Sequence, residues 1–137
     1  WESWEVAKKS FKDVVIGFID TGIDWMHVDF KNADGSTRIL SLWDQTKPIS
    51  SNTPSYGYGQ HWDSSEINLG IPTNNRPNSY HGSTVAGCAA GNGLASGYHK
   101  GVAPESDIIV VQSNFNAADW LSTVVDATDY IYKISAF

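Results

Sequence analysis

An aspartate directly after a hydrophobic run is the first residue of this sequence whose position indicates chemistry. Asp20 follows residues 14–19, which are apolar apart from one glycine and are largely β-branched. A continuous run of this kind is typical of a strand that is buried on both faces of a parallel sheet. The carboxyl ends of such strands open onto the functional crevice of an α/β fold, and a carboxylate there needs a partner or water. Asp20 is therefore a candidate site residue, with the turn at Thr21-Gly22 directing its side chain outward.

A histidine at the start of a small-residue segment is the second candidate. His81 opens the segment 81–93, which contains four glycines among small apolar residues. Each glycine inside a helix costs up to about 1 kcal/mol relative to alanine, so this segment predicts a thin, buried central helix that neighbours approach closely. The positive end of the helix dipole disfavours an imidazolium. A histidine that accepts a proton there needs a carboxylate behind it, and Asp20 is the candidate.

Several interpretations stay open on the residues alone. Asp20 can cap the turn after its strand, serve as one half of an aspartic pair, or orient the histidine of a Ser-His-Asp triad. For His81 the plain alternative is a solvated side chain at a junction between loop and helix. Cys88 fits a small core residue better than a nucleophile. Asn92 and His99 could ligate a metal, but no spacing of histidine, cysteine and carboxylate residues supports a zinc site.

The elements that would position these residues follow in the order of an α/β fold. We predict a strand over 14–19, a strand over 38–43, a helix from His81, a strand over 107–112 and a helix over 117–134. Asn116 is the candidate N-cap of the last helix. Residues 44–80 predict a loop with room for a short element, and residues 1–13 a short helix or arm. We expect strand 107–112 to pair in parallel with strand 14–19, placing Asp20 and His81 within hydrogen-bond reach.

The amino-acid composition excludes several classes of protein. The 137 residues contain 9 Lys and Arg against 15 Asp and Glu, a net charge of −6, and no basic run, which argues against nucleic acid as a partner. The longest apolar runs are far shorter than the ~20 residues of a membrane-spanning helix. The single cysteine, Cys88, excludes an internal disulfide. A chain that opens on Trp1, without an initiator methionine or signal core, is expected to be a processed piece.

Three ordered blocks resemble the subtilisin-like serine proteases (subtilases, peptidase family S8). Residues 14–24, followed by His27 and Asp29-Phe30, are similar to the Asp box of that family. Residues 81–87, His-Gly-Ser-Thr-Val-Ala-Gly, are similar to its His box, usually His-Gly-Thr-His-Val-Ala-Gly. Residues 101–104, Gly-Val-Ala-Pro, match the segment that follows this helix. The resemblance covers residues 14 to about 133 and implies a parallel-sheet α/β fold, with residues 1–137 as the N-terminal portion of one peptidase domain.

The resemblance implies a serine endopeptidase that acts on peptides or proteins. Asp20 would hold His81 in one tautomer, and His81 would take the proton of a serine and give it to the leaving amine. The family order Asp, His, Ser places the nucleophile after His81, yet no serine there stands in the Gly-Thr-Ser setting of the family. We therefore expect this chain to be inactive by itself. A pseudoprotease or binding module of the same fold stays open, because Thr84 replaces the usual second histidine, as does a dimeric aspartic protease using Asp20.

The resemblance also bears on metals, partners and location. We expect no cofactor, with a structural calcium as the open alternative: Asp29 stands where some members bind calcium, but the loop after the His helix, which supplies the other ligands, differs. A sheet edge left open by absent strands would pair with the C-terminal part of the domain or with another copy. Most members are exported, so we expect an extracellular, cell-surface or periplasmic bacterial protein.

Overall fold

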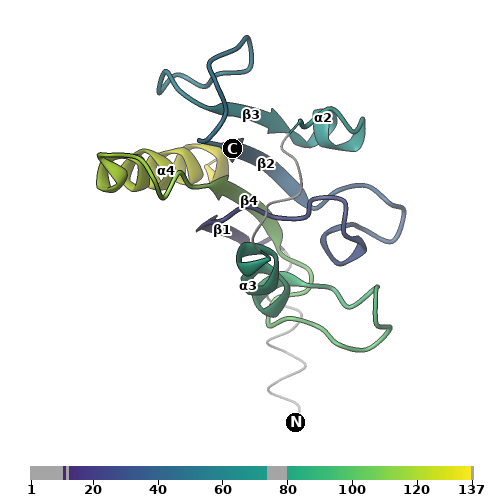
Figure 1. Ribbon diagram of the computed structural model, residues 1–137. Helices are drawn as coiled ribbons and strands as arrows, with labels where there is room; N and C mark the ends of the chain where they lie inside the picture. The colour runs from purple at the N-terminus through teal and green to yellow at the C-terminus, as the bar shows by residue number, and fades with distance from the viewer. Residues whose placement is uncertain (1–10, 12, 74–79, 137) are drawn as a thin grey trace.

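The computed structural model describes residues 11, 13–73 and 80–136, and the structural statements below apply to these (Figure 1). The expected helix or arm over 1–13 falls almost entirely outside them. The elements follow in the order β1 (Val15–Asp20), η1 (Val28–Phe30), β2 (Ile39–Asp44), β3 (Gln60–Asp63), α2 (Ser64–Asn68), α3 (His81–Ala90), β4 (Asp107–Gln112) and α4 (Trp120–Ser135). The loop predicted over 44–80 therefore contains two short elements, β3 and α2. No described helix is long and apolar enough to cross a membrane.

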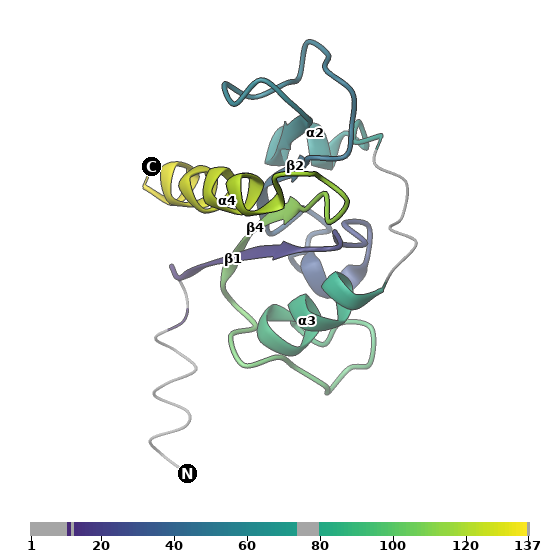
Figure 2. The same cartoon turned by 60° about the vertical axis from the view of Figure 1, so that its left-hand side comes forward.

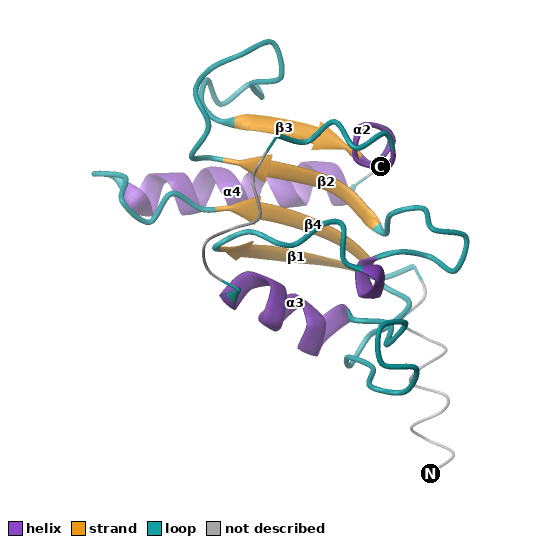
Figure 3. Cartoon of the chain, turned by 45° about the vertical axis from the view of Figure 1, so that its right-hand side comes forward, coloured by secondary structure: helices purple, strands orange, loops and turns teal. Residues whose placement is uncertain are grey.

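The strands form one mostly parallel sheet in the order β1-β4-β2-β3 (Figure 3). β1 and β4 pair in parallel from Val15 opposite Asp107 to Asp20 opposite Gln112, which confirms the predicted pairing. β2 also pairs in parallel with β4, and β3 is added antiparallel to β2. The fold class is α/β, as the order of elements predicted. The parallel register brings the carboxyl ends of β1, β4 and β2 to one edge of the sheet.

Two helices cover opposite faces of this sheet (Figures 2 and 3). Side chains alternate along β4: Ile108 and Val110 pack in a core with α3, and Ile109 and Val111 pack in a core with α4. All four are buried. The continuous apolar run of β4 is therefore explained by burial on both faces, because each face of a parallel strand meets a helix.

β1 lies at the sheet edge among the described strands, although its sequence resembles an interior strand. It contacts α3 on one face and α4 on the other. Gly17 allows the second contact, because a Cβ at this position would stand 2.4 Å from Cγ2 of Ile131 on α4. Only Phe18 of the strand is buried, since no described segment covers its outer edge.

The burial predicted for the helix from His81 is wrong in its extent. The helix from His81 was expected to be buried over 81–93, but α3 ends at Ala90 and buries one face, formed by Gly82, Ala86 and Ala90. Cys88, expected in the core, is exposed on the other face. A helix that touches the sheet on one side buries residues spaced by four, and Cys88 falls outside that series.

The last helix begins later than its sequence predicts. Its N-cap is Asp119 rather than Asn116, and α4 begins at Trp120. The backbone N–H of Asn116 donates to the Oδ1 atom of Asn114 instead, so the segment before the helix folds as a local turn. A side-chain oxygen that bonds nearby backbone competes in this way with helix initiation.

Candidate active site

Asp20 is the last residue of β1, at the carboxyl edge of the sheet. Its Oδ1 atom accepts a hydrogen bond of 2.6 Å from the backbone N–H of Thr21, and its side chain is 15% exposed. Burial raises the pKa of Asp20, but the hydrogen bonds from Thr21 and His81 outweigh that effect and hold the pKa below its ordinary value. The carboxylate is therefore ionised at neutral pH.

His81 is the first residue of α3, and its ring lies against this carboxylate. Nδ1 of His81 is 2.8 Å from Oδ1 and 3.0 Å from Oδ2 of Asp20, which confirms the predicted proximity across 61 residues of sequence. An ionised carboxylate can only accept, so Nδ1 carries the shared proton. In the neutral ring Nε2 then has the lone pair. This arrangement makes His81 chemically suited to take a proton at Nε2 while Asp20 stabilises the resulting charge.

The helix reaches this position because its second residue has no side chain. A Cβ on Gly82 would stand 2.1 Å from the carbonyl oxygen of Gly22 and 3.1 Å from Oδ1 of Asp20. Gly22 itself has a φ of +105°, a conformation that residues with a side chain rarely adopt. The backbone of α3 therefore packs directly on the turn that follows Asp20.

Two hydrogen bonds join the start of α3 to that turn, and we call them the clasp. The N–H of Gly82 donates to Oγ1 of Thr21 at 3.0 Å, and the N–H of Asp24 donates to Oγ of Ser83 at 2.8 Å. Each hydroxyl accepts from backbone on the opposite side of the contact. Sequence reasoning assigned Thr21 only to a turn and gave Ser83 no role. A threonine next to Asp20 and a serine close to His81 were the available signal. Threonine and serine are too common in turns and helix starts for this signal to predict a contact between the two segments.

We expect Ser83→Ala to lower stability by about 1 kcal/mol, because it leaves the N–H of Asp24 without its acceptor. Chemical denaturation measures this loss. Ser122→Ala, on the exposed side of α4, is the matched control and should leave the midpoint unchanged. Equal midpoints for the two variants would show that the bond from the N–H of Asp24 to Ser83 contributes nothing to stability.

Three of the serine hydroxyls that follow His81 have hydrogen-bond partners away from its ring. Ser83 accepts from Asp24, Ser106 donates to the carbonyl of Ala103, and Ser113 accepts from the indole N–H of Trp120. These bonds stabilise loops and the ends of helices. They give none of these three residues the activated setting of a nucleophile, which requires a hydrogen bond to the base.

Asp29, the candidate calcium ligand, lies next to the loop that follows α3. Its Oδ1 atom accepts a hydrogen bond of 2.8 Å from the N–H of Ala95, and its carbonyl accepts from the N–H of Asn92 at 3.1 Å. The described residues contain no group of three His, Cys, Asp or Glu side chains that could hold a metal ion. Asp29 thus ties the loop to η1 through direct bonds.

The sequence and the fold of this chain are similar to those of known proteins. The sequence profile of the Subtilase family (Peptidase_S8) matches residues 11–135. The chain is 29% identical over 140 residues to "Subtilisin-like protease SBT2.2" of Arabidopsis thaliana, covering 85% of this chain and 16% of that protein. The structure of the CspB protease of Clostridium perfringens superposes with a TM-score of 0.65 at 27% identity, covering 89% of this chain and 28% of that one. The chain thus spans less than a third of either relative.

Proposed function

Because this chain belongs to the subtilase family, we propose that it carries two members of the catalytic triad of a serine endopeptidase, Asp20 and His81. The observation that carries the proposal is the contact of 2.8 Å between Nδ1 of His81 and Oδ1 of Asp20. Asp20 fixes the tautomer and orientation of the ring. His81 acts as general base toward a serine hydroxyl and then as general acid toward the leaving amine.

The rest of the machinery belongs to sequence outside residues 1–137 in this proposal. The nucleophilic serine attacks the peptide carbonyl, the proton of its hydroxyl moves to Nε2 of His81, and the acyl-enzyme forms as the amine leaves with that proton. Water then releases the acyl group by the same transfers in reverse order. Residues 1–137 alone are expected to have no peptidase activity, since without the nucleophile the covalent route is closed. We also propose that the substrate is a peptide or protein and that the protein acts outside the cytoplasm.

The test uses the whole protein that contains this chain. A fluorophosphonate should label it covalently, and His81→Ala should remove labelling and lower kcat on a chromogenic peptide by about 10⁴- to 10⁶-fold. His99→Ala, which alters an exposed histidine in the loop after α3, is the control and should leave both unchanged. Labelling that survives His81→Ala at the wild-type rate would refute the proposed role of the histidine.

The alternatives give different results in the same assay. A pseudoprotease would be folded but would react with neither probe nor peptide. An aspartic protease would not be labelled by the fluorophosphonate, would be inhibited by pepstatin and would have its highest activity at acid pH. Turnover by residues 1–137 alone would contradict the assignment of the nucleophile to other sequence.

A further inference from the structure

A buried arginine joins three segments behind the candidate site. Arg38, directly before β2, is 5% exposed. One terminal guanidinium nitrogen donates to the carbonyl oxygens of Asp29 at 3.0 Å and Ala90 at 2.8 Å, and the other donates to the carbonyl of Ser106 at 2.6 Å. These oxygens come from η1, the last residue of α3 and the residue before β4. One side chain therefore connects the starts of two strands with the end of the helix that begins at His81.

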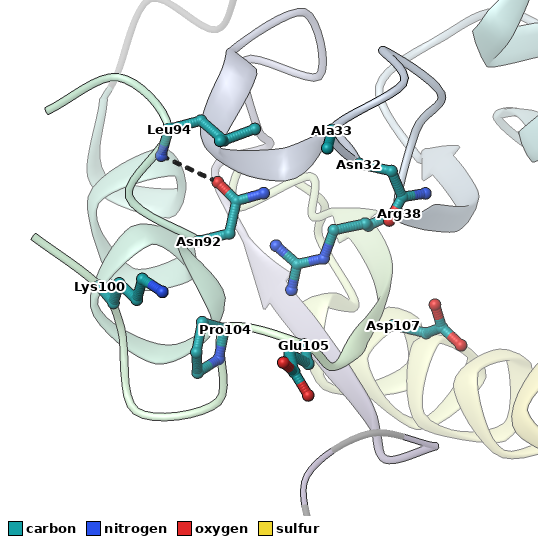
Figure 4. A pocket seen from close by; sticks show the side chains of 9 residues that line it. All are labelled: Asn32, Ala33, Arg38, Asn92, Leu94, Lys100, Pro104, Glu105 and Asp107. Atoms are coloured by element: carbon teal, nitrogen blue, oxygen red, sulfur yellow. Dashed lines mark hydrogen bonds between the residues drawn. The ribbon is translucent and has the colours of Figure 1, made fainter. Parts of the chain in front are cut away.

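The guanidinium lies at a cavity of about 480 Å³ that also touches the loop after α3 (Figure 4). Burial lowers the pKa of Arg38, while the charges of Asp107, Asp29 and Glu105 oppose that effect. An arginine begins from so high a pKa that it stays protonated at neutral pH. A fixed positive charge is thus part of this region of the fold.

The position where the family resemblance allows calcium does not fit that ion here. Calcium takes six to eight oxygen ligands, usually with several carboxylates. Oδ1 of Asp29 is already an acceptor for Ala95, and the carbonyl of Asp29 serves both Arg38 and Asn92. The side-chain oxygen of Asn92 accepts from the N–H of Leu94 within the loop (Figure 4). A divalent cation would have to share these acceptors with their present donors, beside the positive charge of Arg38.

We infer that Arg38 is an internal cation brace that replaces a structural calcium, so the contact between η1, α3 and the loop 91–97 is independent of metal. Backbone carbonyls are ligands for calcium in other proteins and hydrogen-bond acceptors for arginine. In this chain three of them converge on a guanidinium. The inference rests on the contacts of Arg38 and Asp29 and does not depend on the proposed peptidase activity.

Thermal unfolding of the purified protein in CaCl₂ and in EDTA tests whether the contact between η1, α3 and the loop 91–97 is independent of metal. The midpoints should agree within about 1 °C, because a ligand that does not bind the folded state cannot shift them. Asp29→Asn keeps an oxygen acceptor for the N–H of Ala95 and should leave this insensitivity to calcium unchanged. A midpoint that rises by several degrees in CaCl₂, with the rise abolished by Asp29→Asn, would overturn the inference.

Substitution of Arg38 tests whether this side chain stabilises the contact. Arg38→Met keeps the apolar stem but removes the guanidinium donor from the carbonyls of Ala90 and Ser106 and one of the two donors to the carbonyl of Asp29. The midpoint should therefore fall by about 10 °C or more. Arg38→Lys keeps the positive charge but lacks the several N–H donors of the planar guanidinium, so its midpoint should fall less than that of the methionine variant. This variant preserves the test if the methionine variant does not fold. Lys100→Ala, an exposed residue lining the same cavity, is the control and should shift the midpoint by less than about 2 °C. Wild-type midpoints for both arginine variants would refute the brace.

Discussion

Asp20→Asn is expected to lower kcat of the proposed full-length peptidase about 10⁴-fold, the size of effect that the same change has in other Ser-His-Asp enzymes. Asparagine can keep the bond from the N–H of Thr21, so the turn survives. Its amide can also donate to Nδ1 of His81, which favours the tautomer with the proton on Nε2. The base then lacks a lone pair where the serine proton must go. Steady-state kinetics on a peptide substrate measure the loss.

Asp34→Asn is the matched control, because Asp34 is an exposed turn aspartate whose carboxylate accepts from Ser36. It should leave kcat unchanged. An Asp20→Asn enzyme with wild-type kcat would remove Asp20 from the mechanism.

The stability of the Asp20→Asn variant gives a reading that does not depend on activity. The pKa of Asp20 is lowered in the folded protein. The stabilisation from its ionised form is therefore complete above the ordinary pKa of an aspartate and is lost as the pH falls through the lower folded value. The difference in midpoint between wild type and variant should shrink in acid, as the pH falls below the ordinary pKa of an aspartate. A difference that stays the same in acid would assign the effect to another group.

Gly82→Ala should damage both the site and the fold. The added methyl group would stand 2.1 Å from the backbone carbonyl of Gly22, which cannot rotate away, so α3 must shift. Overpacking of this kind costs about 1–3 kcal/mol. A shift of the helix start also carries His81 away from Asp20, and a displacement near 1 Å can cost about 10²-fold in rate. Denaturation midpoints and kcat of the same preparation measure the two effects.

Gly87→Ala tests whether the loss belongs to the position or to glycine as such. It lies in the same helix, has open space around its added methyl group, and should retain activity with equal or higher stability. Equal losses in the two variants would contradict the close approach of Gly82 to the Asp20 turn.

Local patterns were sufficient for the main strands and for the two candidate residues. The apolar run of residues 14–19 predicted a parallel strand buried on both faces. The structure pairs β1 with β4 in parallel from Val15 to Asp20, but of β1 it buries only Phe18. Signals for helix ends were weaker. Asn116 is a good cap by residue type, yet α4 begins at Trp120, because cap preference is a small energy that a nearby turn can outweigh.

The insert between β2 and β3 illustrates what local patterns do not contain. Its turn-rich sequence predicts loop, but Tyr56 and Tyr58 donate hydrogen bonds to Asp129 at 2.6 Å and Asp126 at 2.8 Å on α4. Trp43 of β2 stacks on Tyr56, with ring centroids 5.0 Å apart. The two hydrogen bonds join residues 73 and 68 positions apart in sequence. No property of the tyrosines' neighbours in sequence specifies them.

The amino-acid sequence alone identified Asp20 and His81 as candidate site residues and predicted a parallel sheet with Asp20 at its carboxyl edge. It could do so because strand burial and turn chemistry are local properties of the chain. How the two residues meet depends on three contacts between distant segments: the backbone of Gly82 against Gly22, the clasp at Ser83, and the Arg38 brace behind them. Each of these depends on a distance between segments far apart in sequence, and such distances are set by packing rather than by residue type.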